Sequence, residues 1–125
     1  MQDFRNLQVW KKAHMLVLDV YRQTDDFPKT EIYGLTSQIR RAAASIPENI
    51  AEGCGKHGNP DLVRYLQIAM GSASELEYEL LLARDLEYLE PNEYESLRTQ
   101  LVEMRKMLNG LIISLRKQPA LPSTH

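Results

Sequence analysis

The chain has 125 residues, of which 43% are hydrophobic and 26% are charged, a balance typical of one globular domain with a sizeable core. No apolar run approaches the roughly 20 residues that cross a bilayer, and the N-terminal MQDFRNLQVW lacks the basic and apolar parts of a secretory signal, so we expect a soluble, cytoplasmic protein without a membrane segment. The net charge of −2 excludes a uniformly basic chain, but it hides a split, because residues 75–95 carry −7 and the remainder carries +5.

Four helical patterns follow one another along the chain, and no alternating strand pattern appears. Apolar residues recur at steps of three and four over residues 7–21, 35–50, 62–83 and 94–115. The connectors between these stretches are short, so successive helices are expected to run antiparallel. The sequence therefore predicts an all-α fold, an up-down-up-down antiparallel four-helix bundle over residues 1–117, followed by a disordered tail over residues 118–125.

Glycines and prolines mark the expected helix ends. The glycines of residues 53–55 end the second helix, Asn59 is expected to cap the third, and Pro91 opens the fourth. The sequence GCGKHG at residues 53–58 also matches G-x-G-x-x-G, but a dinucleotide fingerprint follows a strand, and this stretch follows a helix. A helix–helix loop is the preferred interpretation, and a weak anion site at Lys56 is the alternative.

Pro47 lies inside the second helical pattern, where a proline costs roughly 3 kcal/mol. The sequence from Ser45 to Glu48 fits the S-x-x-E capping box, in which the serine caps the Glu48 amide and the glutamate bonds back. We therefore expect the second helix to be kinked, or to restart, at Pro47. A tolerated kink that follows the curvature of the bundle is the simplest interpretation.

No set of residues in the sequence indicates catalysis, a metal or a cofactor. None of the three histidines has a glutamate three residues before it, as di-iron bundles require, and Cys54-x-x-His57 is half of a zinc site without a second half. His14 lies on an apolar row and is expected to be a hydrogen-bonded core histidine. The i, i+4 acidic pairs are expected to be solvated, namely Glu48/Glu52 and Glu75/Glu79. The sequence therefore predicts a protein that is not an enzyme.

Basic residues gather on the polar faces of the helices. On the fourth helix, four residues fall within about 40° of one another at about 100° per residue, and they form a stripe of the kind that contacts phosphates, namely Arg98, Arg105, Asn109 and Arg116. The other candidate binding residues belong to the first helix or to the ends of the second, namely Lys11, Lys12, Arg22, Arg40, Arg41 and Lys56. Ordinary solvation of a helical surface is the alternative.

Two features concern packing, the first between helices of the bundle and the second beyond the single chain. Small residues at 42–44 and 69–74 allow helix backbones to approach closely. Apolar residues also occur away from the main rows, at Tyr78, Leu81 and Leu82 and along a second row of the first helix. A bundle of this size needs only one buried stripe per helix, so the surplus indicates burial between subunits.

Three stretches resemble the four-helix-bundle family encoded by intervening sequences in bacterial 23S rRNA genes, namely FRNLQVWKKAHMLVLDVY, LTSQIRRAAASIPENIAEG and EMRKMLNGLIISL. The resemblance runs from about Phe4 to Lys117, and the central stretch from Arg40 to Gly53 is its most specific part. It implies a homopentamer of bundles around a central channel, with no catalytic residues. A related branch serves diversity-generating retroelements as an accessory protein that binds the reverse transcriptase and template RNA.

These observations lead to one main hypothesis and two alternatives. The main hypothesis is a non-enzymatic homopentamer that binds nucleic acid, structured RNA above all, or an RNA-associated protein, with the acidic residues 75–95 pointing away from the phosphates. The first alternative is a protein-binding scaffold without nucleic-acid contact, whose acidic residues dock a basic partner. The second is an enzyme with a site between subunits, for which the sequence offers no set of residues.

Overall fold

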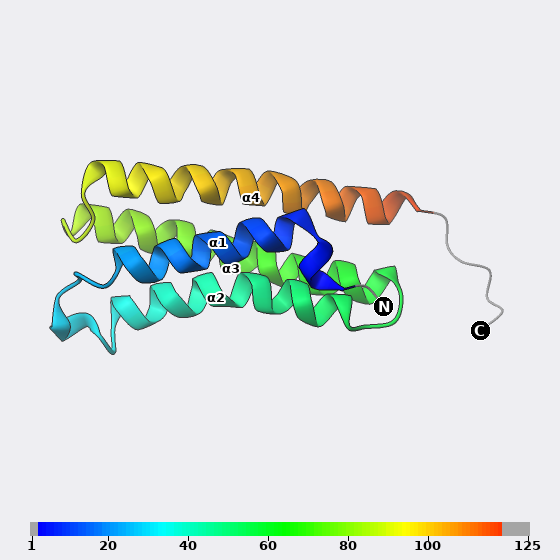
Figure 1. Ribbon diagram of the computed structural model, residues 1–125, viewed down its shortest axis with the longest axis horizontal. Helices are drawn as coiled ribbons and strands as arrows, with labels where there is room; N and C mark the ends of the chain where they lie inside the picture. Colours follow the sequence, from blue (N-terminus) through cyan, green and yellow to red (C-terminus); the bar gives the residue numbers. More distant parts are fainter. Residues whose placement is uncertain (1–2, 119–125) are drawn as a thin grey trace.

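The computed structural model describes residues 3–118 and consists of four long helices joined by short connectors. The helices are α1 (Gln8–Gln23), α2 (Leu35–Cys54), α3 (Asn59–Asp85) and α4 (Pro91–Lys117), with two short 3-10 helices, η1 (Phe4–Asn6) and η2 (Lys29–Glu31). Figure 1 shows the four helices side by side along one long axis, with the chain reversing direction at each connector. The predicted four-helix bundle is confirmed.

The core of the bundle is built from the apolar rows that the sequence pattern predicts for the last three long helices. In α1, the core row is Val9, Ala13, Leu16 and Val20, which is the second apolar row that was expected to face another subunit. Leu7, Trp10 and Val17 of the first row are only partly buried. Burial of each large side chain contributes about 1.5–3 kcal/mol. The largest fully buried side chains are Leu16, Val20, Ile39, Ile46, Ile50, Leu66, Leu76, Leu80, Leu97, Leu101, Met104 and Leu108.

The most extensively packed pair of helices is α2 and α3, because small residues line the contact between them. A Cβ atom on Gly53 would lie only 2.9 Å from Leu62 Cδ1 and from Tyr65 Cβ, so the two backbones approach closely at this point. Near the middle of the same contact, the hydroxyls of Ser45 and Ser72 form a hydrogen bond of 2.8 Å. The close approach that the small residues predict is therefore present.

The expected capping box at Pro47 is wrong. Helix α2 continues through Pro47 as one element, and the Ser45 hydroxyl contacts Ser72 on the neighbouring helix instead of capping Glu48. The Asn49 amide donates to the Ser45 carbonyl at 2.8 Å and to the Ser45 hydroxyl at 3.0 Å. The Pro47 ring is buried, and the bonds from Asn49 stabilise the helical turn around the proline.

Two other helix ends differ from the expectation. Gly58, which has a φ of 89°, occupies the N-cap position of α3, and Asn59 is already helical, with its side-chain amide donating to Gln118 Oε1 at 2.6 Å. Helix α4 begins with a capping box that was not predicted. The Glu93 carboxylate accepts a hydrogen bond from the Glu90 backbone amide, and the Glu90 carboxylate accepts one from the Glu93 backbone amide. Of the predicted tail, only Gln118 belongs to the described residues.

Candidate nucleic-acid interface

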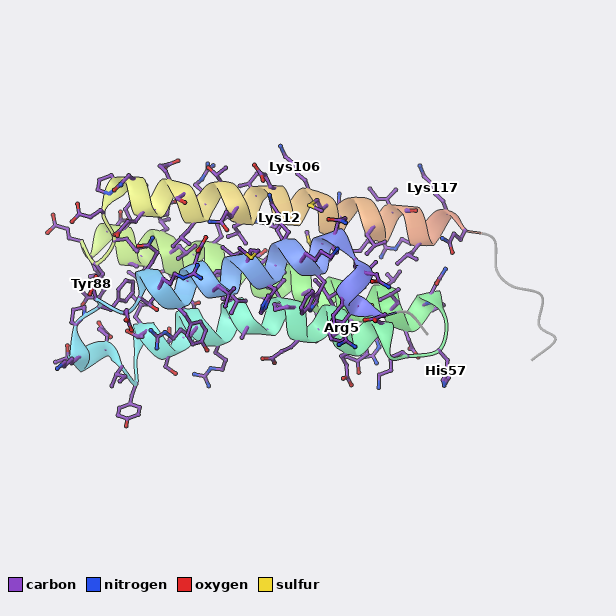
Figure 2. The ribbon with its side chains drawn as sticks, viewed as in Figure 1. Arg5, Lys12, His57, Tyr88, Lys106 and Lys117 are labelled. Atoms are coloured by element: carbon purple, nitrogen blue, oxygen red, sulfur yellow. The ribbon has the colours of Figure 1, made fainter. Side chains whose placement is uncertain are left out.

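Charge is divided between the two ends of the bundle. The end that holds the start of α1, the end of α2, the start of α3 and the end of α4 contains nine basic and five acidic side chains, a net charge of +4. We call this end the basic half (residues 3–17, 45–73 and 102–118). The acidic half (residues 18–44 and 74–101) contains twelve acidic and six basic side chains, a net charge of −6. Figure 2 places Arg5, His57 and Lys117 toward one end and Tyr88 at the other.

The second half of α4 carries the strongest positive charge. Residues 102–118 contain four basic side chains and one glutamate. Lys106, Arg116 and Lys117 are exposed, and none of the three has a carboxylate within ion-pair distance among residues 3–118. We call these three residues the α4 cations. Lys106 borders a groove of about 390 Å³ between α3 and α4, whose lining residues are Met70, Val102, Arg105, Lys106 and Asn109.

Arg105, at the centre of the predicted arginine stripe, is already occupied by α3. Its Nη1 donates to Glu77 Oε1 at 2.7 Å, and its Nη2 donates to Ser74 Oγ at 3.3 Å. The side chain is 28% exposed. Since Glu77 belongs to the acidic segment, the charge of Arg105 is largely neutralised within the bundle, and Arg105 serves to join α3 and α4.

Arg40 is also held by contacts within the chain. Its Nε donates to Thr24 Oγ1 at 2.8 Å, its Nη2 donates to the Tyr21 carbonyl at 3.2 Å, and its guanidinium lies 4.7 Å from the centre of the Tyr21 ring. Arg40 therefore ties α2 to the end of α1. It also borders a groove of about 480 Å³ in the acidic half, which is lined by Tyr21, Ile32, Thr36, Ser37, Arg40, Arg41, Ala44 and Glu48.

The remaining predicted binding residues divide into paired and unpaired groups. Three form ion pairs, namely Lys12 with Glu103 at 2.6 Å, Arg22 with Asp19 at 2.7 Å and Lys56 with Glu52 at 3.4 Å. The pair with Lys12 lowers the pKa of the Glu103 carboxyl. Within residues 3–118, the other predicted cations have no carboxylate at ion-pair distance, namely Lys11, Arg41, Arg98 and Arg116. Six of the ten predicted residues lie in the basic half, whereas Arg22, Arg40, Arg41 and Arg98 lie in the acidic half, so the ten do not share one end of the bundle.

The expectation of a solvated Glu75/Glu79 pair is wrong for one of its members. Glu79 is 6% exposed, and its Oε1 has no hydrogen-bond partner within the described part of the chain. Burial, and after it the nearby Glu75 carboxylate, raise the pKa of Glu79 to about 7, with Arg41 of α2 acting in the opposite direction. Glu79 therefore carries a proton over much of the acidic to neutral pH range.

The expectation of a core histidine at position 14 is also wrong. His14 is exposed, and its ring stacks on Trp10 with a centroid distance of 5.0 Å and an interplanar angle of 7°. Periodicity places both residues on one apolar row but does not distinguish a buried row from a half-buried one. Lys106 and Lys117 lie outside the predicted stripe, although each is adjacent in sequence to one of its arginines.

Comparisons with known proteins agree with the four-helix architecture. Residues 5–110 match the model of the family described as 23S rRNA-intervening sequence protein. A crystal structure of a protein of unknown function from the S23 ribosomal protein family of Bacteroides thetaiotaomicron is 28% identical, with a TM-score of 0.75, and the match covers 83% of this chain and 97% of that chain. A comparison with proteins of curated function finds no match. Among residues 3–118, no helix is long and apolar enough to cross a bilayer.

Proposed function

The chain belongs to the 23S rRNA-intervening sequence protein family, and on that premise we propose that it binds RNA through the basic half of its bundle without catalysing a reaction. The observation that carries this proposal is the division of charge, +4 in one half and −6 in the other. A protein with this division approaches a polyanion with its basic end first, because the acidic end is repelled. The low net charge of the whole chain is therefore compatible with RNA binding.

The α4 cations supply the phosphate contacts in this proposal. Lys106, Arg116 and Lys117 are exposed and have no carboxylate partner within the described residues, so a phosphate does not have to displace an existing ion pair. Asn109 lies between them along α4 and offers an amide donor to a phosphate oxygen. Arg105 and Lys12 contribute less, because Glu77 and Glu103 already hold them.

The direct test is an electrophoretic mobility shift assay with structured RNA at low salt. The triple variant Lys106→Gln, Arg116→Gln, Lys117→Gln is expected to bind RNA much more weakly and to keep the circular dichroism spectrum of the wild type, because the three side chains are exposed. The matched control Arg22→Gln, Lys29→Gln, Arg84→Gln removes the same charge from the acidic half. Equal loss of binding in both variants would mean that only the total charge matters and would refute the proposed surface.

We further propose that the functional form is a homo-oligomer, and the family resemblance favours a pentamer. Apolar side chains remain exposed on several faces of the single bundle, among them Met15, Ile32, Tyr33 and Tyr78, and Tyr33 is 96% exposed. Repetition of weak phosphate contacts in several subunits increases the overall affinity. Light scattering tests this proposal, and we expect a mass of five times the 14.4 kDa chain, whereas a stable 14.4 kDa monomer at micromolar concentration would contradict it.

A protein-binding scaffold is the second candidate function, and the acidic half favours it. Besides the buried Glu79, residues 74–101 contain seven acidic side chains and two arginines, a composition that suits a basic protein partner. Absence of any RNA shift by the wild-type protein at micromolar concentration would support this candidate over RNA binding.

A further inference from the structure

An aromatic cluster lies near the start of the chain, on η1 and α1, and is distinct from the α4 cations. Phe4 contacts Trp10 edge-on with a centroid distance of 4.9 Å, and the His14 ring lies parallel to Trp10 at 5.0 Å. The Arg5 guanidinium lies 5.4 Å from the centre of the Phe4 ring. We call Phe4, Arg5, Trp10 and His14 the aromatic stack. It is contributed by η1 and the first two turns of α1, within the basic half.

The aromatic stack is anchored at one end and open at the other. Phe4 and Trp10 are partly buried and pack against the hydrophobic core, whereas His14 is exposed. Trp10 and His14 are four residues apart, so the α1 helix holds one ring directly above the other. Because one face of the imidazole packs on the partly buried tryptophan and the His14 side chain is exposed, the pair offers a flat aromatic surface on which a planar group can stack.

The charges near the aromatic stack indicate the kind of planar group. Lys11 is exposed, lies one turn before His14 and has no carboxylate within ion-pair distance among residues 3–118. Arg5 is 71% exposed and pairs only with Asp3, at 3.2 Å, within the described chain. Flat aromatic faces next to cations are the combination with which proteins bind single-stranded nucleic acid, the rings stacking on bases and the cations contacting phosphates.

We propose that the aromatic stack is a binding site for an unpaired base of single-stranded RNA, with His14 as the stacking surface and Lys11 on the adjacent phosphate. This inference rests on the proposed RNA-binding function and deepens it. The α4 cations contact phosphates of any RNA, whereas the aromatic stack requires a base that is free to leave its neighbours. Bases within a duplex are already stacked and paired, so the site selects loops, bulges and single strands over double helices.

The experiment uses the fluorescence of Trp10, the only tryptophan in the 125-residue chain. The full-length protein is titrated with a 12-nucleotide oligouridine and, separately, with a 12-base-pair RNA duplex. We expect the single strand to change the emission of Trp10 and the duplex to leave it nearly unchanged. His14→Ala is expected to weaken single-strand binding about tenfold, the usual order for the loss of one stacked base, without changing duplex binding. His14→Tyr is expected to retain single-strand binding, because tyrosine also offers a flat aromatic ring.

The outcomes separate this inference from the proposed function. If wild type and His14→Ala bind both RNAs equally and the Trp10 emission does not respond, the base site is refuted and the α4 surface remains an RNA interface. If His14→Ala changes the mass of the oligomer measured by light scattering and leaves RNA binding unchanged, the aromatic stack is a contact between subunits and the base site is again refuted. If the wild-type protein binds neither RNA, both proposals fail together.

Discussion

Glu79→Gln is expected to remove a pH dependence of stability that the wild-type protein shows between pH 4.5 and 7. In the folded protein, burial raises the pKa of Glu79 from 4.5 to about 7. The unfolded chain releases the same proton near pH 4.5, so folding takes up a proton between these values. The free energy of unfolding therefore falls as the pH rises from 4.5 to 7, and it changes no further above that range.

The size of this effect follows from the two pKa values. The difference between 4.5 and about 7 corresponds to about 3 kcal/mol at about 1.36 kcal/mol per unit. This is a large share of the roughly 5–15 kcal/mol by which domains are stable. Glutamine keeps the shape of the side chain and stays neutral at every pH. We therefore expect Glu79→Gln to be more stable than the wild type by about 3 kcal/mol at pH 8 and by less than about 1 kcal/mol at pH 5.

The assay is urea unfolding followed by circular dichroism at 222 nm, in steps from pH 5 to pH 8 and at one protein concentration. Glu95→Gln is the control, because Glu95 is an exposed glutamate of α4 in the same half of the bundle, and its replacement tests whether loss of any glutamate there changes the pH profile. The lowered pKa of Glu103 acts in the opposite direction, but it is common to all three proteins and cancels in the comparison. Parallel pH profiles of the free energy of unfolding for wild type and Glu79→Gln would contradict this prediction, since Glu79 would then be ionised in the folded protein.

Two further predictions concern the packing of α2. Gly53→Ala is expected to lower the stability by about 1–3 kcal/mol, because its Cβ would lie 2.9 Å from Tyr65 Cβ, whereas Gly71→Ala, with no atom within 4 Å, is expected to raise it by about 0.5–1 kcal/mol. Urea unfolding of both variants checks this, and equal effects would contradict the close approach of α2 and α3. Arg40→Gln is expected to cost about 1–2 kcal/mol through the lost bonds to Thr24 and Tyr21. An unchanged urea midpoint would show that Arg40 does not tie α2 to α1.

The rows of apolar residues predicted the bundle because their spacing is a property of each helix alone. Leu66, Leu76 and Leu80 recur at helical steps, and each is buried in the core. Periodicity does not say which neighbour a polar residue finds. Ser45 fits a local capping motif, but its hydroxyl bonds Ser72, which is 27 residues away in the sequence. Local sequence gives no measure of such a competing partner, so the capping box was predicted and is absent.

The candidate site was less predictable than the fold for the same reason. A helical projection places Arg98, Arg105 and Arg116 on one face, but it cannot show that Glu77 of the adjacent helix binds the middle arginine. Pairing of Arg105 depends on how α3 and α4 are set against each other. Glu79 was expected to be solvated and is buried, whereas His14 was expected to be buried and is exposed. Exposure depends on the neighbouring helices and not on the residue type alone.

The salt dependence of RNA affinity is a direct measure of phosphate contact at the α4 cations, because such contacts release counterions. Fluorescence anisotropy with a labelled single-stranded RNA gives the slope of log affinity against log salt for the wild type and for Lys106→Gln, Arg116→Gln, Lys117→Gln. If each of these side chains neutralises one phosphate, the slope of the triple variant should be smaller in magnitude by about 2, at about 0.7 per phosphate of a single strand. Equal slopes for the two proteins would contradict an RNA interface at the basic half of α4.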